Sequence, residues 1–117
     1  MNIEELRQYC LSKKAVTESF PFDSDTLVFK VMGKIFLLAG ISGSPLSFNV
    51  KCDEEKAIQL REQYASVTPG YHMNKKHWNT ITADGSLTES QLREQVDRSY
   101  ELVTDGLTKK QKKELEG

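Results

Sequence analysis

The stretch TLVFKVMGKIFLLAGI, residues 26–41, predicts two β-strands joined by a tight turn. Polar and apolar residues alternate over residues 26–31, so every second side chain falls on one face of a strand. The apolar side chains of that face are Leu27, Phe29 and Val31. Met32 and Gly33 form a short connection, and residues 34–41 then run back beside the first strand as a hairpin.

Two further strands are predicted on the C-terminal side of this hairpin. Residues 46–52 alternate strictly, and their inward side chains are Leu46, Phe48, Val50 and Cys52. Residues 77–83 form the other strand, which ends at a turn made by Asp84 and Gly85.

Three amphipathic helices are predicted around the strands, over residues 2–14, 53–64 and 88–107. Each begins with a side chain suited to capping the first turn: Asn2, Asp53 and Thr88. We therefore expect an α+β fold, a single domain over residues 1–117 with a curved antiparallel sheet and helices packed on one of its faces. The basic end, residues 108–117, is expected to be a solvated helix or a frayed tail.

The composition is that of a water-soluble globular domain. Of the 117 residues, 38% are hydrophobic and 28% charged. No apolar run approaches the ~18 residues needed to span a bilayer, and the acidic N-terminus is unlike a secretory signal. The two cysteines, Cys10 and Cys52, form no metal or redox spacing and are expected to be buried thiols. We expect a cytoplasmic monomer without membrane contact.

The charge balance limits the kinds of partner. Sixteen Lys and Arg face seventeen Asp and Glu, which gives a net charge of −1. Dedicated nucleic-acid-binding domains usually carry a clear basic excess. Any surface for phosphate must therefore arise from local segregation of charge.

The stretch PGYHMNKKHWNT, residues 69–80, here called the 69–80 segment, concentrates polar and aromatic residues that a core does not need. Lys75 and Lys76 are point charges suited to phosphate, and Tyr71 and Trp78 have rings on which a base could stack. Two asparagines, Asn74 and Asn79, could bond base edges. In the alternative interpretation the segment is a structural turn: the tryptophan fills the core, the asparagines brace the backbone and the lysines are solvated.

The sequence indicates no catalytic or metal site. His72 and His77 would face opposite sides of an extended segment, and no nearby carboxylate or cysteine completes a ligand set. Both cysteines fall at inward positions, where thiols are usually inert. We expect a protein that is not an enzyme and has no cofactor and no metal.

Four stretches together resemble the bacterial MmcQ/YjbR family. They are the 69–80 segment, FPFDSDTLVFKVMGKIF (residues 20–36), VKCDEEKAIQLREQY (residues 50–64) and SYELV (residues 99–103). The resemblance implies a CyaY-like or secretion-chaperone-like α+β fold and a DNA-binding protein of a double-wing type. Asp23 stands where the family often has Gly, and Glu54 where Pro is frequent.

The resemblance implies that DNA is bound by the 69–80 segment together with an adjacent wing at the hairpin. The residues concerned are Tyr71, His72, Asn74, Lys75, Lys76, His77, Trp78, Lys34 and Lys30. The two hairpin lysines could instead be charged residues that protect the solvent side of a strand. Two other functions stay open: a protein-interaction or chaperone-like adaptor, and a small anion- or ligand-binding domain.

Overall fold

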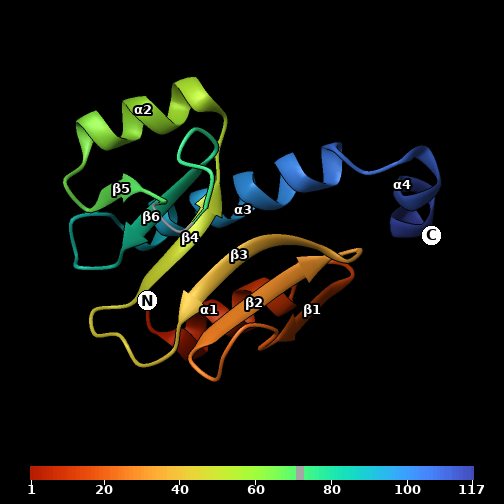
Figure 1. Cartoon of the computed structure of the whole chain (residues 1–117), viewed down its shortest axis with the longest axis horizontal. Coiled ribbons are helices and arrows are strands. Elements are labelled where there is room, and N and C mark those ends of the chain that lie inside the picture. The colour runs from red at the N-terminus through yellow and green to blue at the C-terminus, as the bar shows by residue number, and fades with distance from the viewer. Residues whose placement is uncertain (71–72) are drawn as a thin grey trace.

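The computed structural model describes residues 1–70 and 73–117, which form an antiparallel sheet and a set of helices (Figure 1). The strands are β1 (Val16–Ser19), β2 (Thr26–Val31), β3 (Lys34–Gly40), β4 (Ser47–Lys51), β5 (Val67–Pro69) and β6 (Trp78–Thr82). The helices are α1 (Ile3–Leu11), α2 (Glu54–Gln63), α3 (Glu89–Asp105) and α4 (Lys109–Glu116).

The strands form one sheet in the order β1-β2-β3-β4-β6-β5, and each neighbouring pair is antiparallel. The predicted hairpin is β2–β3. Met32 and Gly33, at its turn, have φ values of 51° and 81°, the positive values that a type I′ two-residue turn requires. The sequence did not indicate β5, a short edge strand that ends at Pro69. Proline is tolerated there because an edge strand needs fewer ladder hydrogen bonds.

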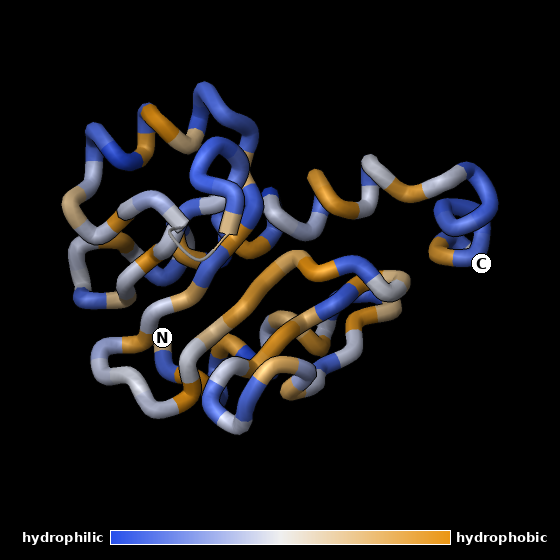
Figure 2. Tube along the Cα trace, viewed as in Figure 1, coloured by the Kyte–Doolittle hydropathy of each residue, from blue (hydrophilic) through white to orange (hydrophobic). Residues whose placement is uncertain are grey.

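One face of the sheet carries the main core. Buried side chains from α1, α2 and α3 pack there against inward side chains of the strands, as the sequence predicts. Phe29, Phe36 and Phe48 are fully buried at its centre. In Figure 2 the hairpin strands stand out as hydrophobic, whereas α4 is largely hydrophilic. The predicted α+β class, with helices on one face, is confirmed.

A single buried hydroxyl group joins α3 to two strands. Ser99, in α3, donates a hydrogen bond of 2.5 Å to the carbonyl oxygen of Phe36 and accepts one of 2.8 Å from the backbone N–H of Lys51. The last paired residues of β3 and β4 on this side are Leu37 and Val50. Phe36 and Lys51 are the next residues beyond this pair, so the hydroxyl group bonds their backbone groups at the point where β3 and β4 diverge in Figure 1.

The opposite face of the sheet, here called the open face, carries a second, smaller apolar cluster. It consists of Val28, Leu38 and Trp78, with Ile35 and Met73 packed against it. The sequence predicts a solvent-facing side for β2, yet Val28 is fully buried. The reason is tertiary, because Met73 and Trp78 of the 69–80 segment cover this part of the open face.

Gly70 fits closely against Trp78. Its backbone N–H donates a 2.9 Å hydrogen bond to the carbonyl oxygen of Trp78. A Cβ atom on Gly70 would lie 2.9 Å from Trp78 Cβ and 3.0 Å from Trp78 O, which is closer than real Cβ contacts. The glycine of the 69–80 segment is therefore required by packing.

The basic C-terminal segment is a capped helix. Thr108 and Gln111 form a capping box at the start of α4, and Leu115 packs against the edge of the main core. Lys14 Nζ donates a 2.8 Å hydrogen bond to the carbonyl oxygen of Glu116. Among residues 1–70 and 73–117, no helix is long and apolar enough to cross a membrane.

Replacing Ser99 with alanine should lower the free energy of unfolding by about 1–3 kcal/mol, because the buried carbonyl oxygen of Phe36 and the partly buried N–H of Lys51 lose their partner. Urea denaturation would measure the change. Ser90→Ala, an exposed position near the start of the same helix, is the control and should change stability by less than about 0.5 kcal/mol. Equal stabilities of the two variants would show that the hydroxyl bridge contributes nothing.

Replacing Gly70 with alanine should also destabilise the fold, by about 1–3 kcal/mol, since the new methyl group overlaps Trp78. The matched control is Gly43→Ala, where an added Cβ would meet only ordinary contact, 3.6 Å from the carbonyl oxygen of Pro45. Thermal unfolding followed by circular dichroism would compare them. An unchanged midpoint for Gly70→Ala would contradict the close fit.

Candidate nucleic-acid interface

Residues 74–77, here called the basic loop, lead into β6 and are all exposed. The side-chain oxygen of Asn74 accepts a 3.0 Å hydrogen bond from the backbone N–H of Lys76, and its carbonyl oxygen accepts one of 3.1 Å from His77 N. The carbonyl oxygen of His77 in turn accepts a 2.7 Å bond from Cys52 N, just beyond β4. Backbone bonds therefore fix the loop, and its long side chains face solvent.

The structure corrects the role expected for Trp78. Its side chain is only 8% exposed and packs against Val28 and Leu38 on the open face. The ring therefore offers no open face on which a base could stack. Trp78 therefore has the structural role of the alternative interpretation, because burying its large ring against the sheet is more favourable than leaving the ring in water.

Asn79 is likewise structural. It is fully buried on the helix-covered face, and its side-chain nitrogen donates a 3.3 Å hydrogen bond to the carbonyl oxygen of Ala57 in α2. It therefore holds α2 against β6 and cannot reach a base edge. Of the other predicted residues in this segment, Tyr71 and His72 lie outside the described residues.

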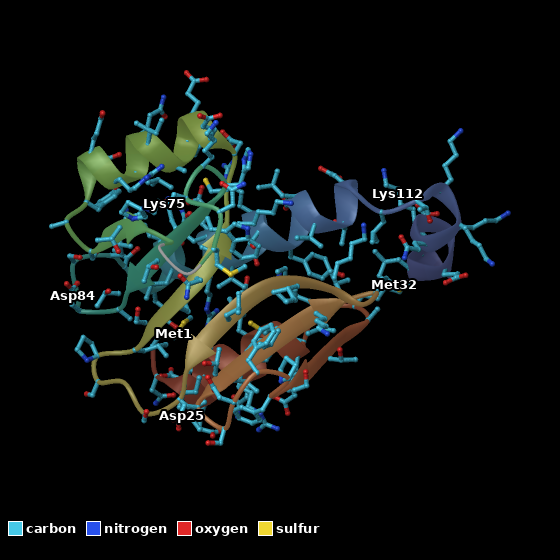
Figure 3. The ribbon with its side chains drawn as sticks, viewed as in Figure 1. Met1, Asp25, Met32, Lys75, Asp84 and Lys112 are labelled. Atoms are coloured by element: carbon cyan, nitrogen blue, oxygen red, sulfur yellow. The ribbon has the colours of Figure 1, made fainter. Side chains whose placement is uncertain are left out.

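The two hairpin lysines do not form a wing beside the basic loop. Lys30 pairs with Thr17 and Ile35 and alternates with the buried Phe29, so its side chain is on the open face. Lys34 pairs with Val31, whose side chain lies in the main core, and is therefore on the other face. Figure 3 shows the turn at Met32 next to α4, far from Lys75 beside α2.

Lys51 is a basic residue that the sequence argument did not assign to the interface. It pairs with Trp78 across β4 and β6, so both residues share the open face. Alternation along β4 predicts only that Lys51 faces away from the core. Its nearness to the 69–80 segment depends on the sheet order, in which β6 is the neighbour of β4.

The open face also contains a groove of about 550 Å³. Met73, which leads into the basic loop, forms one wall, and Phe22, before β2, forms another. The full lining consists of Phe22, Asp23, Thr26, Leu38, Ala39, Gly40, Asn49 and Met73. The sequence contains no local signal for this groove, because its walls come from four separate parts of the chain.

The cysteines lie in environments that suppress their reactivity. Both are buried, as predicted, and burial raises the pKa of the Cys10 thiol to about 12. Burial also raises the pKa of Cys52. Since the thiolate is the nucleophile, neither thiol is activated at neutral pH. Within residues 1–70 and 73–117, no group of three His, Cys, Asp or Glu side chains could hold a metal ion.

Solved structures show the same fold. A Deinococcus radiodurans protein, DR2400, whose crystal structure is described as a DUF419 domain, superposes with a TM-score of 0.91 and 42% identity. The match covers 97% of this chain and 87% of DR2400. A Pseudomonas syringae protein matches with a TM-score of 0.74 and 26% identity, over 87% of this chain and 98% of that protein.

Sequence relatives agree with this assignment. YbdF of Escherichia coli O157:H7 is 37% identical over 113 residues, which cover 96% of this chain and 92% of YbdF. YjbR of Escherichia coli K12 is 35% identical over 115 residues, 98% of each chain. The YjbR family model matches residues 11–102. The predicted resemblance is thus confirmed, and the chain belongs to the YjbR family.

Proposed function

We propose that the protein binds the phosphate backbone of DNA, using the basic loop and the lysines of the open face. The observation that carries this proposal is the basic loop itself, where consecutive cationic side chains are exposed on a backbone fixed to the sheet. Lysine is a compact charge that binds phosphate without demanding one geometry. A fixed loop also loses little conformational entropy on binding.

The rest of the open face supports the same role. Lys51 is on this face and pairs with Trp78, directly after the basic loop, so it would extend the positive charge of Lys76 along β4. Lys30 is on the same face but lies further away, in β2. The acidic first turn of α2 follows Cys52, which is bonded to His77, so the local positive charge comes from exposed lysines gathered near one another and not from a surface without carboxylates. A local group of lysines of this kind can give a phosphate site in a chain of net charge −1.

The geometry also sets the character of the binding. Because Trp78 is covered, it adds no base stacking, and the lysines of the basic loop would contact phosphate electrostatically. A few lysines neutralise only a few phosphates, so affinity should be modest and strongly dependent on salt. Backbone contacts of this kind position a protein on DNA without reading its sequence.

Changing Lys75 and Lys76 together to glutamate should abolish DNA binding. In a gel electrophoresis assay, the variant should no longer slow the migration of a DNA duplex of about 30 base pairs at about 50 mM salt. The reason is that two attractive charges at the phosphate contact become repulsive. The control is Lys112→Glu with Lys113→Glu on α4, which makes the same change in net charge away from the basic loop and should keep most of the binding. Circular dichroism would verify that both variants are folded.

A salt titration of the wild-type protein completes this test. The logarithm of the affinity should fall linearly with that of the salt concentration, by about 0.9 for each neutralised phosphate. Absence of any retardation of the wild type at about 50 mM salt would refute the proposal. Equal loss in the two charge-reversal variants would show that net charge, and not the basic loop, governs binding.

A further inference from the structure

We propose that the groove on the open face accepts an unpaired nucleobase, so that the preferred ligand is single-stranded nucleic acid. This inference rests on the proposed function and specifies its ligand. It is carried by the juxtaposition of an apolar groove, an exposed aromatic ring and the basic loop on one face of the sheet.

The groove has the size and lining of a site for a flat organic group. Its volume of about 550 Å³ falls within the range of roughly 300–1,000 Å³ that is usual for small-ligand pockets. Its lining includes three large apolar side chains, those of Leu38, Met73 and Phe22. The exposed area of the lining is mostly apolar, as expected where a ring is to be removed from water.

Phe22 supplies the stacking surface that Trp78 does not. Its side chain is 66% exposed although it belongs to the largest apolar residues of the chain. Burial of such a ring against a ligand would be favourable, because it removes apolar surface from water. A base stacked on an aromatic ring contributes about 1–3 kcal/mol to the binding free energy. Any of the bases can do so, because every base has a π-face. An exposed ring on the wall of a groove is therefore suited to this contact.

Two polar groups of the groove match the edge of a base. The carboxylate of Asp23 accepts hydrogen bonds from the backbone N–H groups of Asp25, at 2.9 Å, and Thr26, at 2.6 Å. These bonds lower the pKa of Asp23, so it stays ionised at neutral pH. Its second oxygen has only a 3.2 Å bond from the Thr26 hydroxyl and retains acceptor capacity for an exocyclic amino group.

Asn49 supplies the complementary donor. Its side-chain oxygen accepts a 2.6 Å hydrogen bond from the Thr80 hydroxyl, so the amide nitrogen of this groove-lining residue remains as the donor. A carboxylate acceptor and an amide donor in one apolar groove correspond to the mixed donor and acceptor edge of a nucleobase. The carboxylate of Asp23, by contrast, would repel a phosphate.

The phosphate instead belongs at the other end of the groove. Met73 forms a groove wall and is followed directly by the basic loop, so a base beside Met73 places its phosphate toward the exposed lysines. Figure 3 shows Lys75 beside α2. Asp25, whose backbone N–H is bonded to Asp23, lies at the lower edge of the molecule in the same view. This separation of charge orients a nucleotide, with the base toward Asp23 and the phosphate toward the basic loop.

The same geometry distinguishes a single strand from a duplex. In a duplex the faces of the bases are stacked on one another, so none can lie on Phe22 without being pulled from the helix. In a single strand the bases can be splayed out and stacked on aromatic side chains at little cost. DNA and RNA single strands share this chemistry, and they differ at the site in the 2′-hydroxyl group and in the methyl group of thymine.

The test measures fluorescence anisotropy of three labelled ligands with one sequence of about 20 nucleotides: single-stranded DNA, single-stranded RNA and duplex DNA. The wild-type protein should bind at least one single strand more tightly than the duplex. Phe22→Ala should weaken binding of that strand by about 5- to 150-fold and leave duplex affinity unchanged. Phe22→Trp, which preserves the ring, should retain the preference.

The matched control is Phe20→Ala. Phe20 is also exposed, at 47%, but lines a different hollow beside α1 and should leave all three affinities unchanged. Equal or tighter binding of the duplex by the wild type, or equal effects of the two alanine variants, would overturn this inference while DNA binding stands. Failure of all three ligands to bind would overturn the proposed function together with it. A difference between the RNA and DNA strands would identify the natural source.

Discussion

The hydroxyl group of Ser99 is the contact on which the arrangement of the sheet depends. It lies between the carbonyl oxygen of Phe36 and the backbone N–H of Lys51 and forms a hydrogen bond with each. Both backbone groups therefore keep a partner where the two strands separate. The sheet can therefore open between β3 and β4 without leaving buried backbone groups unpaired, which would be costly. Because Ser99 is in α3, the same contact also fixes the longest helix across the divergence. The strands β4, β6 and β5 form one half of the sheet and β1 to β3 the other.

The 69–80 segment combines architecture with an exposed surface. Trp78 and Asn79 are adjacent in the chain, yet one packs on the open face and the other on the helix-covered face, as alternation along a strand requires. Gly70 permits the close approach to Trp78. Gly70, Trp78 and Asn79 are buried within the fold, whereas the exposed basic loop has no part in the core. The functional proposal therefore rests on residues 74–77, and Trp78 belongs to the structure.

The open face gives the small basic loop a wider context. Lys30 and Lys51 lie on this face, as does the groove between Phe22 and Met73. A positively charged end and an acidic end share one surface, which is a more specific feature than a uniform basic patch. The relatives of known structure support the fold of this surface, and the proposed chemistry comes from the side chains of this chain.

The sequence by itself determined the elements whose signals are local. The capping boxes of α1 and α3, the turn at Met32 and Gly33, and the alternation along β4 each depend on residues a few positions apart, and all are present. The order of these local elements predicted the α+β class with helices on one face of an antiparallel sheet, and the resemblance carried by four stretches predicted the family. Only the tertiary structure decided that Trp78 is covered, that Lys30 and Lys34 lie on opposite faces, and that Phe22 lines a groove. The physical reason is that burial and proximity depend on which strands are neighbours, and that order is set by contacts between residues distant in the chain.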